Sequence, residues 1–81
     1  MTPEQAFGQI LRATREERQL SQERLALESG YSREYVSMIE RGHKNPTLVA
    51  IFRLAQVLAI SPSELVRRAE ARQPTLPDLE S

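Results

Sequence analysis

Two helix starts and two helix stops fall within one short segment, and they constrain the fold more than any other feature of the sequence. Ser21 and Ser32 are each suited to cap a helix, because a serine hydroxyl can accept a hydrogen bond from a free N–H of the first turn. Gly30 and Gly42 are each suited to end a helix, because glycine adopts the left-handed conformation easily. The segment therefore predicts two short helices joined by a tight turn.

The apolar residues of this segment predict how the two helices pack. Small Ala26 allows the second helix to cross closely over the first, while Val36 and Ile39 are spaced to hold the second helix against a core. The opposite face of the second helix then points outward, as in a helix that enters the major groove of DNA. We predict a helix-turn-helix over about residues 22–41.

Three further helices are predicted, and the sequence contains no period-2 strand pattern. Thr2 and Pro3 favour a helix over about residues 3–18, and Thr47 favours a helix that begins just after it. The sequence SPSE at residues 61–64 is a capping box that opens a last helix, which should fade near Arg72. We predict an all-α domain of five helices over residues 1–72 and a disordered tail over residues 73–81.

The helix after Thr47 has the widest apolar face of the five. A helix that is apolar around much of its circumference is usually enclosed by its neighbours, so we expect this helix to be central and the most buried. The apolar residues on which the expectation rests are Leu48, Ile51, Phe52, Leu54, Ala55 and Leu58.

Length, charge and cysteine content exclude several classes of protein. The chain has 81 residues, enough for one small domain, and its formal net charge of 0 is unlike that of a polycation that coats nucleic acid or anionic membranes. It lacks cysteine, a secretory signal and any apolar run near the roughly 18 residues that a membrane span needs. We expect a small cytoplasmic domain that uses no membrane and no small-molecule ligand.

No group of residues predicts catalysis, a metal site or a cofactor site. The single histidine, His43, follows Gly42 in a polar loop, which favours a solvated side chain over a general base. Glu16 and Glu17 are adjacent, so on a helix their side chains point about 100° apart and cannot share one site. We therefore expect that the protein is not an enzyme and holds no cofactor.

Several linked motifs give the sequence a specific family resemblance over roughly Phe7 to Arg68. The motifs are SQERLA at 21–26, GYS at 30–32, YVSMIERG at 35–42, NPTL at 45–48, LA at 54–55 and SPSEL at 61–65. With this spacing the chain resembles the phage-repressor helix-turn-helix family (Cro-like, XRE). Its length is similar to that of the controller proteins of restriction–modification systems, although small phage repressors and antitoxin subunits share the same architecture.

The resemblance implies a compact five-helix, lambda-repressor-like DNA-binding domain that acts as a homodimer on a palindromic double-stranded operator. The family's motifs place the reading residues on the second helix of the helix-turn-helix, where turning the helix at about 100° per residue directs one face outward. The residues expected to contact base edges are Arg33, Glu34, Ser37, Met38 and Arg41. The residues expected to contact phosphates are Gln22, Ser32, Tyr35, Lys44, Asn45 and Thr47.

Three of these assignments have open alternatives. Tyr35 either donates to a phosphate or stacks on a base, and we favour the phosphate. Glu34 repels phosphate, so it either accepts a hydrogen bond from a cytosine amino group or orients Arg33. Met38 contacts either a thymine methyl group or a second protomer, and we favour the methyl group.

The resemblance also implies a structural ion pair, and the sequence suggests a dimer interface. The family counterpart of Arg15 pairs with an acid at the position of Glu40, across the first and third helices. The last helix carries apolar residues that so small a domain cannot all bury, so we expect an interface formed mainly by this helix and the end of the fourth helix, with Ile60, Leu65, Val66 and Ala69.

Two features depart from the family pattern. Ala59 stands where the family often has glycine at the end of the fourth helix, and the net charge is low for a DNA-binding protein. Two other functions remain open at this point: an antitoxin-type subunit that covers a toxin and regulates its own operon, and a structural helical module. The cluster of Arg33, Ser37, Arg41 and Lys44 argues against the structural module.

Overall fold

The computed structural model describes residues 1–72, and in this part of the chain the five predicted helices are all present. Their order and bounds are α1 (Pro3–Glu17), α2 (Gln22–Ser29), α3 (Arg33–Glu40), α4 (Leu48–Val57) and α5 (Pro62–Arg72). Each helix begins within a residue of its predicted start, because the starts are set by local capping residues. The predicted tail at residues 73–81 lies outside the described residues.

Side-chain caps begin the helices as the sequence predicts. The hydroxyl of Thr2 accepts a hydrogen bond from the Gln5 N–H, and the Gln5 side chain accepts one from the Thr2 N–H, which completes a capping box. Ser21, Ser32 and Thr47 each accept a hydrogen bond from the N–H three residues later. These bonds occupy one free N–H group at the first turn of each helix.

The capping box predicted for α5 is only half formed. Ser61 accepts a hydrogen bond from the Glu64 N–H, but the Glu64 carboxylate accepts hydrogen bonds from Arg67 and Arg68 instead of returning to the cap. These two guanidinium groups lower the pKa of Glu64 to about 2. The α4–α5 turn places Ala59 at φ 57°, so alanine takes the left-handed conformation that glycine would adopt more easily.

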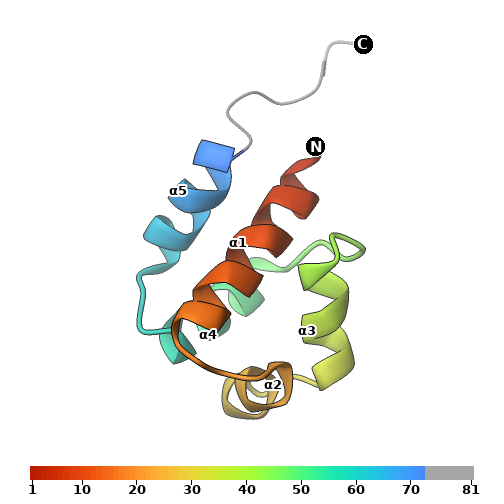
Figure 1. Cartoon of the computed structure of the whole chain (residues 1–81), viewed down its shortest axis with the longest axis vertical. Helices are drawn as coiled ribbons and strands as arrows, with labels where there is room; N and C mark the ends of the chain where they lie inside the picture. The colour runs from red at the N-terminus through yellow and green to blue at the C-terminus, as the bar shows by residue number, and fades with distance from the viewer. Residues whose placement is uncertain (73–81) are drawn as a thin grey trace.

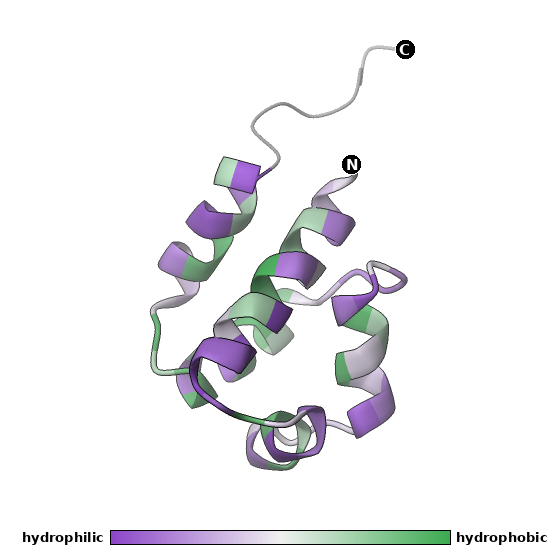
Figure 2. Ribbon diagram, viewed as in Figure 1, coloured by the Kyte–Doolittle hydropathy of each residue, from purple (hydrophilic) through white to green (hydrophobic). Residues whose placement is uncertain are grey.

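The helices enclose one core, with α1 between α3 and α5 (Figure 1). The helix-turn-helix lies at one end, where α2 contacts both α3 and α4. Hydrophobic residues alternate with hydrophilic ones along each helix, so most helices have an apolar inner face and a polar outer face (Figure 2). The buried apolar residues that fill the core are Phe7, Ile10, Leu11, Leu25, Ala26, Val36, Ile39, Leu54, Ala55, Leu58, Leu65 and Ala69.

The expectation that α4 is the central, most buried helix is wrong, because only part of its wide apolar face is buried. Leu54, Ala55 and the C-cap residue Leu58 are buried, but Leu48 is 70% exposed and Phe52 is 55% exposed. Only one face of α4 is covered, by the core that it shares with its neighbours α2 and α5, and the opposite face is left open. The wide apolar face predicted from the sequence therefore consists of a buried stripe and an uncovered one.

The dimer interface expected on α5 and the end of α4 also needs correction. Leu65 is fully buried and Ala69 nearly so, and both belong to the core of the protomer itself. A side chain with no accessible surface cannot contact a second chain unless the domain opens. Of the four residues expected there, Val66 is exposed and Ile60 is half-buried.

Within residues 1–72 no single helix is long and apolar enough to cross a membrane. The helices α4 and α5 satisfy the length and composition criteria only as a pair, and they are bent by 105° at the break between them.

Gly8 allows α1 to lie unusually close to α3. A Cβ atom at this position would lie 2.3 Å from the carbonyl oxygen of Ile39 and 2.7 Å from that of Glu40. Both atoms are backbone, so neither can move aside as the end of a flexible side chain can. The absence of a side chain at Gly8 therefore sets the distance between α1 and the C-terminal turn of α3.

We predict that Gly8→Ala destabilises the protein although it places a better helix former in α1. Alanine favours a helix over glycine by about 1 kcal/mol, whereas forcing a methyl group into a filled interface costs about 1–3 kcal/mol, and the backbone contacts here place the cost at the upper end. Thermal and urea unfolding should show a net loss of stability. Gln9→Ala, at the neighbouring exposed position, should change the free energy of unfolding by less than about 0.5 kcal/mol. A stabilised Gly8→Ala variant would show that the helices separate without cost.

Candidate nucleic-acid interface

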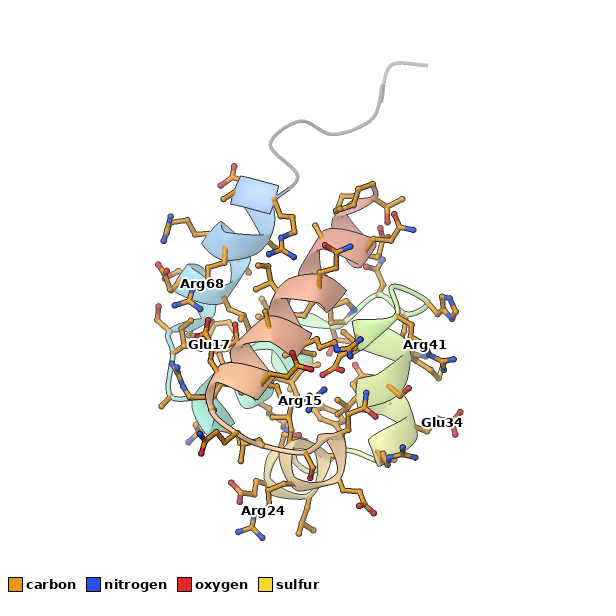
Figure 3. The ribbon with its side chains drawn as sticks, viewed as in Figure 1. Arg15, Glu17, Arg24, Glu34, Arg41 and Arg68 are labelled. Carbon is orange, nitrogen blue, oxygen red and sulfur yellow. The ribbon has the colours of Figure 1, made fainter. Side chains whose placement is uncertain are left out.

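The helix α3 presents a polar face to solvent and is held by its apolar face. Val36 and Ile39 are fully buried against the core. Glu34 and Arg41 point away from the rest of the molecule (Figure 3), and Arg33 in the first turn is also exposed. Ser37 and Met38 are half-buried on the same side. Four of the five residues predicted to contact bases therefore lie on the outer part of α3, and the fifth, Arg41, is its C-cap residue.

A buried ion pair joins α1 to α3, as expected. Nε of Arg15 donates to Oε2 of Glu40 at 2.7 Å, and Nη2 of Arg15 donates to Oε1 at 3.1 Å. The two parallel bonds form the bidentate arrangement that gives arginine–carboxylate pairs their fixed geometry. The Glu40 side chain is only 3% exposed and the Arg15 side chain 11%. The hydrogen bonds to Glu40 raise the pKa of Arg15, so its guanidinium stays charged.

Glu40 and Arg15 bind further groups that belong to the helix-turn-helix. Nε2 of Gln22 donates to Oε1 of Glu40 at 2.9 Å, and Nη1 of Arg15 donates to the carbonyl oxygen of Leu20 at 2.8 Å. The pair therefore fixes the N-terminus of α2 as well as α3. Gln22, predicted to contact a phosphate, has one of its two amide hydrogens engaged in this way and the other remaining to donate.

A polar hollow of about 550 Å³ lies above the pair, between α1 and the two helices of the helix-turn-helix. Its lining includes four arginines and the first residues of α2, and is formed by Arg12, Arg15, Ser21, Gln22, Glu23, Arg33, Ser37, Glu40 and Arg41. Guanidinium groups and the N–H groups at a helix start both favour an anion. The hollow is thus chemically suited to a phosphate group beside α3.

The remaining residues predicted to contact phosphates lie around the ends of α3 and α4. Ser32 and Thr47 use their hydroxyl oxygens as helix caps, which leaves each hydroxyl hydrogen available to donate. Lys44 and Asn45 are exposed in the loop that follows α3. Tyr35 is half-buried, and its ring is stacked on the ring of Tyr31 with the centroids 4.6 Å apart.

Ion pairing explains how a chain with a formal net charge of 0 can present a positive surface at α3. In residues 1–72, six arginines pair with glutamates; they are Arg12, Arg15, Arg18, Arg24, Arg67 and Arg68. The basic residues of the same part of the chain without a carboxylate partner are Arg33, Arg41, Lys44, Arg53 and Arg72. All of these except Arg72 lie on or beside the helix-turn-helix. The unpaired cations therefore gather around α3, whereas the paired arginines are spread over α1 and its C-cap, α2 and α5.

Comparison with known proteins agrees with this geometry. The family model described as Helix-turn-helix matches residues 11–65, which include all of α2, α3 and α4. The chain belongs to this helix-turn-helix family. Its members are DNA-binding transcriptional regulators rather than enzymes, and membership confirms both the XRE-type resemblance and the five-helix fold.

Relatives of this helix-turn-helix family include restriction–modification controllers. The control protein C.BamHI of Bacillus amyloliquefaciens is 39% identical over 61 residues, which cover 74% of this chain and 75% of that protein. An HTH-type transcriptional regulator of Sinorhizobium fredii, y4dJ, is 46% identical over 52 residues, 64% of this chain and 68% of that protein. The crystal structure of the controller C.AhdI from Aeromonas hydrophila superposes with a TM-score of 0.75 at 50% identity, covering 76% of this chain and 94% of that one.

We predict that Arg15→Ala strongly destabilises the domain, because it leaves the Glu40 carboxylate buried without its cation. Losing one partner of a buried pair costs about 3–5 kcal/mol, and a domain of this size loses about 4–8 °C of melting temperature per kcal/mol. Arg12→Ala is the matched control, since its pair with Glu16 is exposed and worth less than about 1 kcal/mol. Thermal unfolding of both variants tests the difference. Equal, small losses of melting temperature in the two variants would mean that Arg15 acts as an ordinary surface charge.

Proposed function

We propose that the protein is a sequence-specific transcriptional regulator that binds a palindromic operator as a homodimer, in the cytoplasm. The observation that carries the proposal is the position of α3, whose polar face is exposed while its apolar face and Glu40 are fixed to the core. A rigidly held helix with exposed guanidinium groups can enter the major groove in one orientation. The helix-turn-helix family supplies the DNA-binding activity, and the similarity to controller proteins supports a regulatory role.

Specificity is assigned to the outer face of α3 and positioning to its surroundings. Arg33 is exposed in the first turn, where a guanidinium can donate paired hydrogen bonds to O6 and N7 of guanine. Glu34, Ser37, Met38 and Arg41 complete the reading face. Gln22, Ser32, Tyr35, Lys44, Asn45 and Thr47 are assigned to phosphates, which fix the register of the protein on the duplex.

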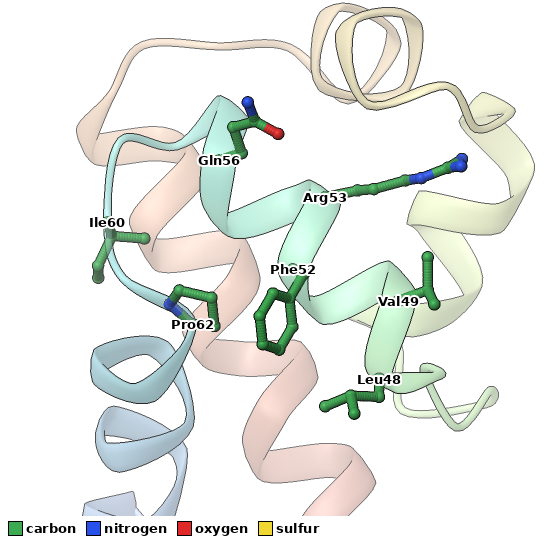
Figure 4. A pocket seen from close by; sticks show the side chains of 7 residues that line it. All are labelled: Leu48, Val49, Phe52, Arg53, Gln56, Ile60 and Pro62. Atoms are coloured by element: carbon green, nitrogen blue, oxygen red, sulfur yellow. The ribbon is translucent and has the colours of Figure 1, made fainter.

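The uncovered stripe of α4 supports a dimer. Leu48, Val49 and Phe52 are exposed and line a groove of about 560 Å³ together with Ile60 and three flanking residues, Arg53, Gln56 and Pro62 (Figure 4). Exposed apolar side chains that lie together on one face indicate an interaction site more than single exposed ones do. We assign the homodimer contact to this α4 face, defined by Leu48, Val49, Phe52 and Ile60; of the four residues expected from the sequence, it keeps Ile60 and leaves out the three on α5.

Selection of bound sequences from a random DNA pool tests the proposed operator. The selected sites should be palindromes, with half-sites about one helical turn (34–36 Å) apart or a multiple of that distance.

Arg33→Ala should then weaken binding to the selected site by about 1–3 kcal/mol and relax the preference at one position of each half-site. Lys44→Ala should weaken all sequences alike and reduce the salt slope by about 1 per protomer. An Arg33→Ala variant with unchanged base preference would place Arg33 on a phosphate.

Light scattering of a second set of variants over a concentration series tests the α4 face. Phe52→Glu should raise the dissociation constant of the dimer by about 30-fold or more, corresponding to about 2 kcal/mol, because it places a charge within an apolar contact. Leu27→Glu is the control, since Leu27 is also an exposed apolar residue but lies on α2. Val66→Glu tests the α5 surface. If Val66→Glu yields monomers and Phe52→Glu does not, the dimer forms through α5.

A further inference from the structure

We propose that Arg53 of α4 is a further contact to the DNA backbone and that Tyr31 holds it in place for this purpose. The contact would lie on the flank of α3 opposite the polar hollow that Gln22 and Arg33 line. The inference rests on the proposed placement of α3 in the major groove, and it adds a residue from outside the helix-turn-helix to the phosphate-binding set.

Three side chains form a continuous stack between α4 and α3. The rings of Tyr31 and Tyr35 are stacked with their centroids 4.6 Å apart and their planes 24° apart. Cζ of Arg53 lies 5.6 Å from the centroid of the Tyr31 ring, within the range of a cation–π interaction. Arg53 extends away from α4, on a course different from that of Phe52 (Figure 4). The guanidinium also reaches the α2–α3 turn, since Nη1 would lie 3.4 Å from a Cβ atom at Gly30.

The charge of Arg53 has no counterpart in residues 1–72. No carboxylate of this part of the chain lies within ion-pair distance of it, and the residue is exposed. A cation held over an aromatic face keeps its N–H groups free to donate. Holding the long side chain in advance lowers the conformational entropy that binding would otherwise cost. An arginine placed in this way can bind a phosphate oxygen without breaking an existing pair.

The position of the stack matches the second backbone of a major groove. A helix in that groove has one sugar–phosphate strand on each side, and the hollow beside Ser37 faces one of them. At about 100° per residue, Tyr35 lies about 160° around α3 from Ser37, so it faces the other strand. The Tyr35 hydroxyl and the Arg53 guanidinium then approach the same stretch of backbone, where both can donate to phosphate.

Measurement of binding against salt concentration tests the contact. We use a duplex carrying the sequence selected from the random pool and a scrambled duplex of the same length. Arg53→Gln should reduce the slope of log K against log salt by about 0.9 per protomer, and should weaken both duplexes by about fivefold per protomer near 0.15 M salt. The base preference should not change. Arg24→Gln is the control, since Arg24 pairs with Glu28 on α2 and its loss should leave the slope unchanged.

The role of Tyr31 is tested by two replacements. Tyr31→Phe keeps the ring and should retain wild-type affinity and slope, whereas Tyr31→Leu removes the ring and should lose part of the affinity that Arg53→Gln loses. The double variant with Tyr31→Leu and Arg53→Gln should lose little more DNA-binding affinity than Arg53→Gln alone, because Tyr31 acts through Arg53. Additive losses would overturn the positioning role of Tyr31.

Two results would overturn the contact itself. An unchanged slope and affinity in Arg53→Gln would show that Arg53 does not touch DNA. An unchanged slope together with a weaker dimer, measured by light scattering, would place Arg53 in the protein–protein interface. Wild-type protein that selects no sequence from the pool would instead contradict the proposed function, so the two failures are distinguishable.

Discussion

The Glu40 carboxylate is the group on which the geometry of the helix-turn-helix depends. It is almost fully buried, yet it is charged, so it requires partners that cannot be replaced by water. Arg15 of α1 and Gln22 of α2 supply them, and Glu40 itself belongs to α3. Three helices therefore meet at one side chain. Apolar packing at Val36 and Ile39 gives α3 its stability, whereas hydrogen bonds at Glu40 give it a defined rotation and register.

Local signals account for the parts of the fold that the sequence predicts well. Caps such as Ser21, Ser32 and Thr47 act within one helical turn, so they can be recognised without knowing what surrounds them. The pair between Arg15 and Glu40 was predicted from the family resemblance, because 25 residues separate its partners. The assignments of the other site residues to bases or phosphates remain predictions.

Features that depend on a distant neighbour could not be predicted in the same way. Gly8 lies inside a helix, and its importance comes only from the two carbonyl groups of α3 that approach it. The apolar pattern of α4 does not distinguish a stripe that the core covers from one that it leaves open, so Phe52 was assigned to the interior. Arg53 resembles the other surface arginines in the sequence, and only the structure shows that it stacks on Tyr31 and has no acidic partner in residues 1–72.

The pairing of charges has a consequence for how the protein meets DNA. Within the described residues, most arginines away from α3 are neutralised by a nearby glutamate, while the cations around α3 outnumber the unpaired acids Glu23 and Glu34 there. A molecule of this kind is drawn to a polyanion weakly as a whole but is turned by the electric field as it approaches. The field acts chiefly as a torque that presents α3 first. Productive encounters are then favoured over random ones, while unrelated DNA holds the protein only briefly.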